Sequence, residues 1–346
     1  MSLLPRERVL LALAGQEPDA VPWIEGIVED DIASKIAGEP IRVSWDIAPT
    51  GRPVMSGAQL AEEQKKVCRA FGKDNLMYNA FAPIYAERMV GPDGRVMVGR
   101  GLIDSRDKLP QLVFPDPHDD SYYAPAAEFL AHKGDYAACG SIRLGIGATL
   151  YTMGVEAFTY SLMDGDGLAE EILQRYVDWN VVVVQRLQEM GFDYVWAFDD
   201  IAADSGPLIS PRLYREVVLP RLKEAVQVID VPWIYHSDGD LNPLLADLVS
   251  LGMNALHPLQ PDVMDIYAVR EAFPGLGLVG NIDMTLMAQG RPEQVTELVR
   301  ERIQRLAPAG GYMISSSNSI TDYLQEANVR AMVEAVRTYR HRPYTG

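Results

Sequence analysis

The chain has 346 residues, of which 48% are hydrophobic, and a formal net charge of −17. This much apolar sequence can build a large folded core, which argues against a disordered chain. The strong negative charge would repel phosphate backbones and anionic lipid headgroups, so binding to nucleic acid or to a membrane surface is not expected.

Cysteine usage and the amino-terminal sequence favour a cytoplasmic protein. Cys68 and Cys139 are too few for a disulfide framework. The charged residues Arg6, Glu7 and Arg8 interrupt the first apolar stretch, and no apolar run reaches the roughly 18 residues of a membrane span. We therefore expect neither a signal peptide nor a transmembrane segment.

The first fifteen residues predict a short amphipathic helix ahead of the first strand. From there, β-rich runs alternate with stretches of helical period, the pattern of βα units around a parallel sheet. Most runs are apolar throughout, as expected of strands covered on both faces. The predicted strands are residues 21–27, 74–80, 137–143, 193–198, 231–236, 253–258, 276–281 and 311–316.

Helical patterns separate these strands. Ser210 followed by Pro211 is typical of an N-cap with proline at the first helical position, and Pro220 should kink or split the helix that begins there. Residues 84–104 predict an inserted β-hairpin that turns at Pro92, Asp93 and Gly94. The predicted helices are residues 56–71, 121–132, 167–190, 211–229, 241–251, 263–273, 291–307 and 322–339.

Eight strands with intervening helices favour an α/β fold of the (β/α)8 TIM-barrel type, decorated by the amino-terminal helix and the hairpin. No linker, low-complexity tract or fixed-period repeat divides the sequence. We therefore expect residues 1–346 to form a single barrel domain.

Polar residues follow the predicted strands at their carboxyl ends. In a (β/α)8 barrel the reacting groups lie at that face, so a single polar pocket built from several strands is expected. The strand-end residues are Glu25, Glu29, Asp30, Asn79, Ser141, Arg143, Asp199, Asp200, His236, Ser237, Asp238, His257, Gln260, Asn281, Asp283 and Ser315 to Asn318. As substrate contacts we predict Glu25, Arg143, Tyr151, Asp199, Gln260, Asn281, Asp283, Ser316 and Asn318.

An alternative interpretation is that loops are polar in any fold, since Asp, Asn and Ser favour turns and helix caps. Adjacent acids directly after VWAF must nevertheless direct at least one carboxylate toward the barrel mouth, which favours a functional Asp200. The glycines of 145–154 (GIGATLYTMG) are better explained by a tight turn than by a ligand. His118, His132 and His341 are expected at the surface.

His236, Asp200 and Asp238 are the predicted catalytic residues. His236 with either acid could form a general acid/base pair. The same three side chains could instead bind Zn²⁺ or another divalent metal through one nitrogen and two or three oxygens. A serine nucleophile is not expected because no G-x-S-x-G motif is present. Residues 275–280 match G-x-G-x-x-G but contain a predicted strand, so we do not expect a dinucleotide site.

Several segments resemble the uroporphyrinogen decarboxylase superfamily, which also includes corrinoid methyltransferases. They are RERVLLALAGQEPDAVPW, YVWAFDDIAADSGPLISPRLYREVVLPRLKEAV, IYHSDGDLNPLLADLVSLGMNALHPLQ, GNID and SSNSITDYLQEANVRAMVEAV, in the family's order. The resemblance covers nearly the whole chain and implies a (β/α)8 barrel with its cavity at the carboxyl-terminal face. It also implies a homodimer.

The resemblance to true uroporphyrinogen decarboxylases is incomplete. Their first-strand loop carries arginine, whereas WIEGIVEDDIA carries acids and no arginine. Asn79 stands where those enzymes have an aspartate, Asp200 where they have a serine, and Ser316–Asn318 where they have a histidine. Like charges in a poorly solvated cavity repel, so a substrate with eight carboxylates is not expected beside Glu25, Glu29 and Asp30.

The methyltransferase branch is more similar. Its thiol-directed members have a His-x-Cys pair and a later cysteine that bind zinc, and here His236 is kept while Asp238 and Ser315–Ser317 replace the cysteines. The HSDG form resembles members linked with O-demethylation.

Three hypotheses follow. The leading one is methyl transfer from a small substrate to a corrinoid protein or cofactor, assisted in one version by a metal bound to His236, Asp238 and Asp200. The second is a metal-free decarboxylase or lyase of a small acid, with Asp200 and His236 moving a proton and Arg143 binding the anion. The third is a corrinoid- or tetrapyrrole-binding protein without catalysis.

Overall fold

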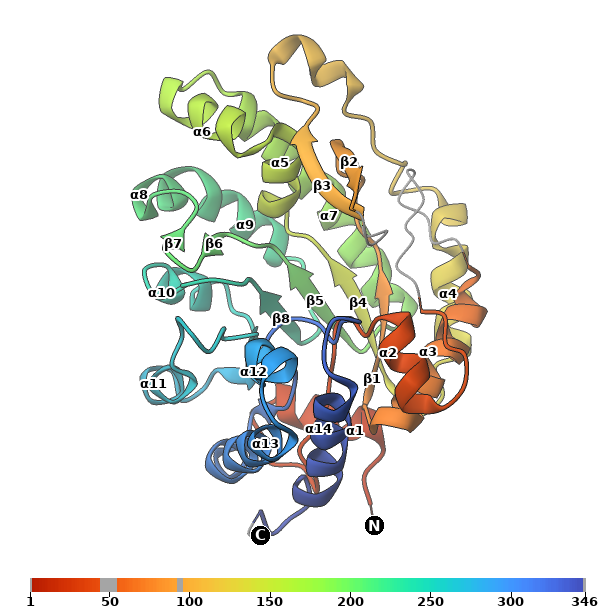
Figure 1. Cartoon of the computed structure of the whole chain (residues 1–346). Coiled ribbons are helices and arrows are strands. Elements are labelled where there is room, and N and C mark those ends of the chain that lie inside the picture. Colours follow the sequence, from red (N-terminus) through yellow and green to blue (C-terminus); the bar gives the residue numbers. More distant parts are fainter. Residues whose placement is uncertain (1, 44–54, 92–95, 345–346) are drawn as a thin grey trace.

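The structure is a computed structural model that describes residues 2–43, 55–91 and 96–344. Its central feature is a seven-stranded parallel sheet, curled as Figure 1 shows, with helices around its outer side. The strands, in sheet order, are β1 (Asn75–Asn79), β4 (Ala137–Ile142), β5 (Tyr194–Phe198), β8 (Trp233–His236), β9 (Ala255–His257), β10 (Gly277–Val279) and β11 (Tyr312–Met313). The predicted barrel-type fold is confirmed.

The segment predicted as the first strand, residues 21–27, is not a regular strand. It makes an isolated parallel bridge instead, between Trp23 and Ile314. The Ile24 amide donates to the Ile314 carbonyl at 3.1 Å, and the Asp74 amide donates to the Trp23 carbonyl at 2.8 Å. The Asp74 carboxylate also binds the Trp23 amide. The Asp74 side chain thus supplies a hydrogen bond that a regular neighbouring strand would otherwise supply. Through these bonds the segment connects the two edge strands of the sheet, β1 and β11.

The helices follow the predicted order, with additions. The described helices are α1 (Pro5–Leu13), α2 (Asp30–Ala37), α3 (Gly57–Phe71), α4 (Ala124–Ala131), α5 (Ile146–Met153), α6 (Val155–Asp164), α7 (Leu168–Met190), α8 (Pro211–Leu213), α9 (Leu219–Val226), α10 (Leu245–Val249), α11 (Ile266–Ala272), α12 (Met284–Gln289), α13 (Pro292–Leu306) and α14 (Glu326–Tyr339). Short 3₁₀ segments cover Arg106–Gln111, Asp120–Tyr123 and Ala307–Ala309. The sequence did not predict α2, α5, α6 or α12.

The helix predicted over 211–229 is divided. Ser210 caps it, with its hydroxyl accepting from the Leu213 amide. After α8 comes a π-helical turn, Tyr214–Val218, and α9 begins just before Pro220. Since proline has no amide hydrogen to donate and its ring crowds the preceding turn, the predicted split at this position is confirmed.

The glycine-bearing segment 145–154 is a helix rather than the tight turn expected from its sequence. Gly145 (φ 134°) and Gly154 (φ 80°) stand at the two ends of α5 in backbone conformations that favour glycine. The apolar residues between them pack into the core, which explains why the segment continues as helix.

The inserted hairpin is confirmed. Strands β2 (Ala86–Val90) and β3 (Val96–Gly101) pair antiparallel, and Figure 1 shows them beside α5. The predicted turn at residues 92–94 lies outside the described residues. A second small ribbon, β6 (Ala202–Ala203) with β7 (Gly206–Pro207), follows β5.

Large side chains from the strands fill the inner side of the sheet. This cluster is fully or almost fully buried and includes Met77, Cys139, Tyr194, Trp196 and Ile234. As in other barrels, the interior is therefore a packed core on which a pocket can rest. Both cysteines are buried and free. Among the described helices, none is long and apolar enough to cross a membrane.

Candidate active site

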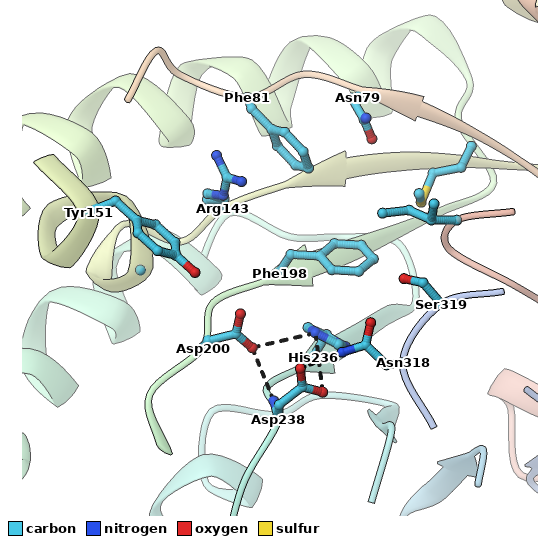
Figure 2. Close-up of a pocket in the computed structure, with 13 residues that line it drawn as sticks. Asn79, Phe81, Arg143, Tyr151, Phe198, Asp200, His236, Asp238, Asn318 and Ser319 are labelled. Carbon is cyan, nitrogen blue, oxygen red and sulfur yellow. Dashed lines mark hydrogen bonds and ion pairs between the residues drawn. The ribbon is translucent and has the colours of Figure 1, made fainter. Parts of the chain in front are cut away.

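A pocket of about 330 Å³ opens where β1, β4, β5 and β8 run into their loops. A cavity of this size suits a small ligand. Figure 2 shows its walls, and the lining residues are Ile27, Met77, Asn79, Phe81, Arg143, Gly147, Tyr151, Phe198, Asp200, His236, Asp238, Asn318 and Ser319. The predicted position of the site at the carboxyl ends of the strands agrees with this geometry.

One wall of the pocket is formed by Asp200, His236 and Asp238. Strand register explains why they lie close together. Phe198 at the end of β5 pairs with His236 at the end of β8, and Asp200 and Asp238 each stand two residues beyond these ends. His236 Nε2 lies 3.5 Å from Asp200 Oδ1 and 3.9 Å from Asp238 Oδ1. The Asp238 amide donates to Asp200 Oδ1 at 3.0 Å, which holds the two loops together.

Asp238 is held on one side only. Asn318 Nδ2 donates to Asp238 Oδ2 at 2.5 Å, whereas Asp238 Oδ1 is buried and has no hydrogen-bond partner among the described residues. Burial raises the pKa of Asp238, and the neighbouring Asp200 raises it further, while His236 and Asn318 lower it. Because buried polar atoms are almost always paired, this oxygen is an available ligand atom.

The three side chains fit a divalent metal. One ligand atom from each lies within 4.8 Å of the others. An imidazole nitrogen with two carboxylate oxygens is a donor set that Zn²⁺ accepts in catalytic sites, where a further position stays open for substrate. The unpartnered Asp238 Oδ1 is the specific feature that favours a cation over a closed hydrogen-bond network.

The opposite wall carries a positive charge. The Arg143 guanidinium carbon lies 4.4 Å from the centre of the Phe81 ring, a cation–π contact. Burial lowers the pKa of Arg143, and the nearby Asp199 opposes this. Asn79 Oδ1, on the same side of Phe198 in Figure 2, is buried without a hydrogen-bond partner in the described structure. The pocket therefore offers a cation and an amide to a polar group of its ligand.

Asp199 lies beneath the pocket and not in its lining. Its carboxylate accepts from the Gly145 amide at 2.9 Å and the Gly147 amide at 2.7 Å. Burial raises the pKa of Asp199 to about 7, against these two hydrogen bonds. A Cβ at residue 147 would stand 2.9 Å from Asp199 Oδ1, so glycine is needed for this close approach. Asp199 thus holds the start of α5 through these two amides.

Glu25 and Ser316, also predicted as substrate contacts, are fully buried and absent from the lining. Glu25 accepts hydrogen bonds from the Ser316 amide at 2.7 Å and the Ser316 hydroxyl at 2.8 Å. Both side chains are hydrogen-bonded to each other inside the protein, and neither lines this pocket.

Three further predicted contacts lie outside the pocket for the same reason. Asn281 Oδ1 accepts from Arg302 Nε at 2.8 Å, and Asn281 Nδ2 donates to the Leu259 carbonyl. Gln260 connects the Gly239 amide to Asp204. Asp283 caps α12 by accepting from two backbone amides. These are structural hydrogen bonds of the strand-end loops.

Sequence reasoning missed the apolar part of the lining. Ile27, Met77, Phe81 and Phe198 contribute carbon surface, and Ser319 adds a hydroxyl beyond Asn318. The prediction used only the polar residues at strand ends. Phe198 stands directly before the two acids, and this position could have indicated an apolar residue of the pocket. His118, His132 and His341 are exposed, as predicted.

Comparison with known proteins identifies the family. Residues 89–339 match the family model of uroporphyrinogen decarboxylase (URO-D). The chain belongs to the uroporphyrinogen decarboxylase family. Asp200, His236 and Asp238 lie within the matched region.

Curated relatives include both activities of the superfamily. Methylcobamide:CoM methyltransferase MtbA from Methanosarcina mazei is 25% identical over 190 residues, 54% of either chain. A methylated-thiol–coenzyme M methyltransferase from the same organism is 28% identical over 159 residues, 45% of this chain and 41% of the relative. The alignments therefore span about half the length of these two relatives. A uroporphyrinogen decarboxylase from Chlorobium phaeobacteroides is 25% identical over 271 residues, 72% and 75% of the two chains.

Solved structures support the fold. A methyltransferase from Methanosarcina mazei superposes with a TM-score of 0.74 at 18% identity, covering 97% of this chain and 99% of that one. A B12-independent methionine synthase from a Shewanella species gives a TM-score of 0.52 at 10% identity, with 92% and 98% covered. At these identities the likeness concerns architecture only.

Proposed function

We propose that this member of the URO-D family is a methyltransferase that passes a methyl group from a small substrate to a corrinoid protein or cofactor. In this proposal a divalent metal such as Zn²⁺ binds to Asp200, His236 and Asp238. The observation that carries it is the convergence of these three side chains on a pocket of small-ligand size. The methyltransferase relatives support the reaction type.

A metal in this site supplies Lewis acidity toward a substrate heteroatom. The protein's own residues do the remaining work. Asn318 fixes the orientation of Asp238 through the hydrogen bond to Oδ2. Phe198 and Met77 provide an apolar surface for a methyl group and keep water from that side of the pocket. Tyr151, 38% exposed, borders the mouth through which a corrinoid partner would approach.

Metal loading tests the proposal. The full chain is incubated with zinc salt, dialysed and measured for bound metal by elemental analysis. We expect about one zinc per chain in the wild type and none above background in His236→Ala. Absence of stoichiometric metal from the wild type would contradict the proposal.

The control variant is Asp283→Asn. This residue is also a strand-end acid, but it caps α12 and lies outside the pocket. Asparagine caps helices as well as aspartate does, so the fold should be retained. Asp283→Asn should bind zinc as the wild type does, and loss of zinc in this variant would show that binding depends on general acidity.

Arg143 favours a second candidate function, a metal-free decarboxylase or lyase of a small acid. Its guanidinium faces the pocket with no hydrogen-bonded protein partner among the described residues and is suited to a carboxylate. Thermal-shift assays with small monocarboxylates would test it. We expect a monocarboxylate to stabilise the protein, and a chelator to leave this stabilisation unchanged. In Arg143→Met the apparent affinity for the monocarboxylate should fall about tenfold. No stabilisation by any monocarboxylate would count against this candidate.

A further inference from the structure

A line of buried polar side chains runs from the pocket into the protein behind His236. His236 Nδ1 lies 2.6 Å from His257 Nδ1, and His257 Nε2 lies 3.3 Å from Ser315 Oγ. Ser315 Oγ in turn donates to Glu25 Oε2 at 3.2 Å. These residues stand at the ends of β8 and β9, just after β11, and in the segment that connects the sheet edges.

All members of this line are shielded from water. His257, Ser315 and Glu25 have no exposed surface, and His236 is 6% exposed. Buried polar groups must therefore satisfy one another, since leaving one unpaired costs about 1–3 kcal/mol. The direction of each hydrogen bond can then be deduced from the groups at the ends.

Glu25 fixes the direction at the buried end. It accepts four hydrogen bonds: from Trp23 Nε1 at 2.9 Å, from the amide and hydroxyl of Ser316, and from Ser315 Oγ. Four donors match the acceptor capacity of an ionised carboxylate, which has no hydrogen to give. Burial raises the pKa of Glu25, while the hydrogen bonds from Trp23 and Ser316 and the Lys73 ammonium lower it. The donor arrangement is the one that an ionised Glu25 requires.

The remaining bonds follow in sequence. Because the Ser315 hydrogen is used by Glu25, Ser315 Oγ accepts from His257 Nε2–H. His257 is fully buried, where a charged imidazole would be far more costly than a neutral one, so this ring carries one hydrogen. With that hydrogen on Nε2, His257 Nδ1 accepts from His236 Nδ1–H.

We propose that Glu25, Ser315 and His257 are positioning residues that set the tautomer of His236, leaving its Nε2 lone pair directed toward Asp200 and Asp238. The two acids alone would favour the opposite tautomer, since Asp200 Oδ1 at 3.5 Å could accept a hydrogen from Nε2. The buried line overrides this local preference.

A bare Nε2 is the form of imidazole that binds a metal. This use of the tautomer rests on the proposed function, whereas the tautomer itself does not. Glu25 and His257 thereby gain a role that their distance from the ligand would otherwise hide. Glu25 acts on the pocket through three hydrogen bonds instead of contacting the substrate.

Nitrogen-15 NMR of the metal-free full chain tests the proposal, because ring nitrogens with and without hydrogen have distinct shifts. The protein is labelled on histidine, and the His236 signals are assigned by their loss in His236→Gln. In the wild type we expect His236 to be protonated on Nδ1 and bare on Nε2. A wild-type His236 with its hydrogen on Nε2 would overturn the proposal.

Ser315→Ala breaks the line between Glu25 and His257. We expect it to shift His236 toward the Nε2–H form. The matched control is Ser141→Ala, the same change at a buried β4 hydroxyl that has no hydrogen-bond partner among the described residues. That variant should leave the tautomer unchanged. An unchanged tautomer in Ser315→Ala would also overturn the proposal. Glu25→Gln provides a second break in the line at its buried end.

Zinc titration of the same variants separates this inference from the proposed function. Loss of an outer hydrogen bond to a ligating histidine weakens metal affinity about 10–100-fold, so Ser315→Ala should bind zinc that much more weakly than Ser141→Ala. If no variant binds zinc while the NMR result is as expected, the positioning role holds and the metal-assisted function fails. Equal zinc affinity in the two variants would contradict the role in metal binding.

Discussion

Two acidic groups lie at opposite ends of the same sheet: Asp74 is buried, whereas the Asp238 side chain is 33% exposed, and their surroundings differ. Asp74, just before β1, receives hydrogen bonds from the Arg340 guanidinium and the Trp23 amide, and Arg8 Nη1 lies 3.5 Å away. Asp238, just after β8, has no arginine or lysine partner in the described part of the chain, and its Oδ1 is unpaired.

The contrast separates a carboxylate that the protein pairs with arginine from one that it does not. Burial raises the pKa of both groups. At Asp74 two guanidinium groups oppose the effect of burial, whereas at Asp238 a histidine and an amide oppose it and a second acid adds to it. A buried charge that the protein neutralises holds the fold together, while one left without a countercharge is a place for a cation from outside.

Breaking the paired end should have the largest effect on stability. Arg340→Met leaves Asp74 buried without its main partner and removes hydrogen bonds to the Val21 and Gly72 carbonyls. We expect the free energy of unfolding to fall by about 3–5 kcal/mol in urea denaturation.

Arg337→Met, in the helix that Arg340 caps, is the matched control. Its side chain is 47% exposed, pairs with Glu334 and donates to the Ala70 carbonyl. This change should cost less than about 1 kcal/mol. If the two variants lost similar stability, the structural role of the Asp74 group would be wrong.

Changing the unpaired end should affect the metal-free fold far less. Asp238→Asn removes the repulsion with Asp200, so the free energy of unfolding should change by no more than about 1 kcal/mol. Zinc affinity should fall at least about 100-fold, because a first ligand is lost. Urea denaturation and zinc titration measure the two effects, and a variant with lower stability but unchanged zinc affinity would reverse the assignment.

The smallest effect is expected at Asp104, a half-buried acid. Hydrogen bonds from Lys108 and Arg100 lower the pKa of Asp104 from 3.8 to about 2. A lowered pKa in the folded state adds stability that is present above about pH 4 and lost as the pH falls through about 2. Asp104→Asn should therefore be less stable at pH 7 by under about 1 kcal/mol, with the difference vanishing near pH 2. A difference that grew on acidification would contradict the pairing.

Strand order, most helices and the face that carries the pocket were predictable from apolar runs and from polar residues at strand ends. That Asp200, His236 and Asp238 lie close together could be predicted, because His236 ends β8 and each acid stands two residues beyond a paired strand end. The irregular segment at 21–27 could not, since its bonds come from the distant Asp74.

Which strand-end residues face the ligand was less predictable. Asp199 and Asp200 are neighbours, yet one binds the Gly145 and Gly147 amides while the other lines the pocket. Asn281 is turned away by Arg302, more than twenty positions along the chain. Such choices depend on partners brought together only by folding, which a local pattern does not contain.

The proposed metal site at Asp200, His236 and Asp238 can be tested with a crystal structure of the cobalt-loaded protein and anomalous diffraction at the cobalt edge. We expect one strong peak about 2.0–2.2 Å from His236 Nε2 and within bonding distance of both carboxylates. A fully cobalt-loaded crystal with its peak elsewhere, or with none at these three side chains, would contradict the proposed site.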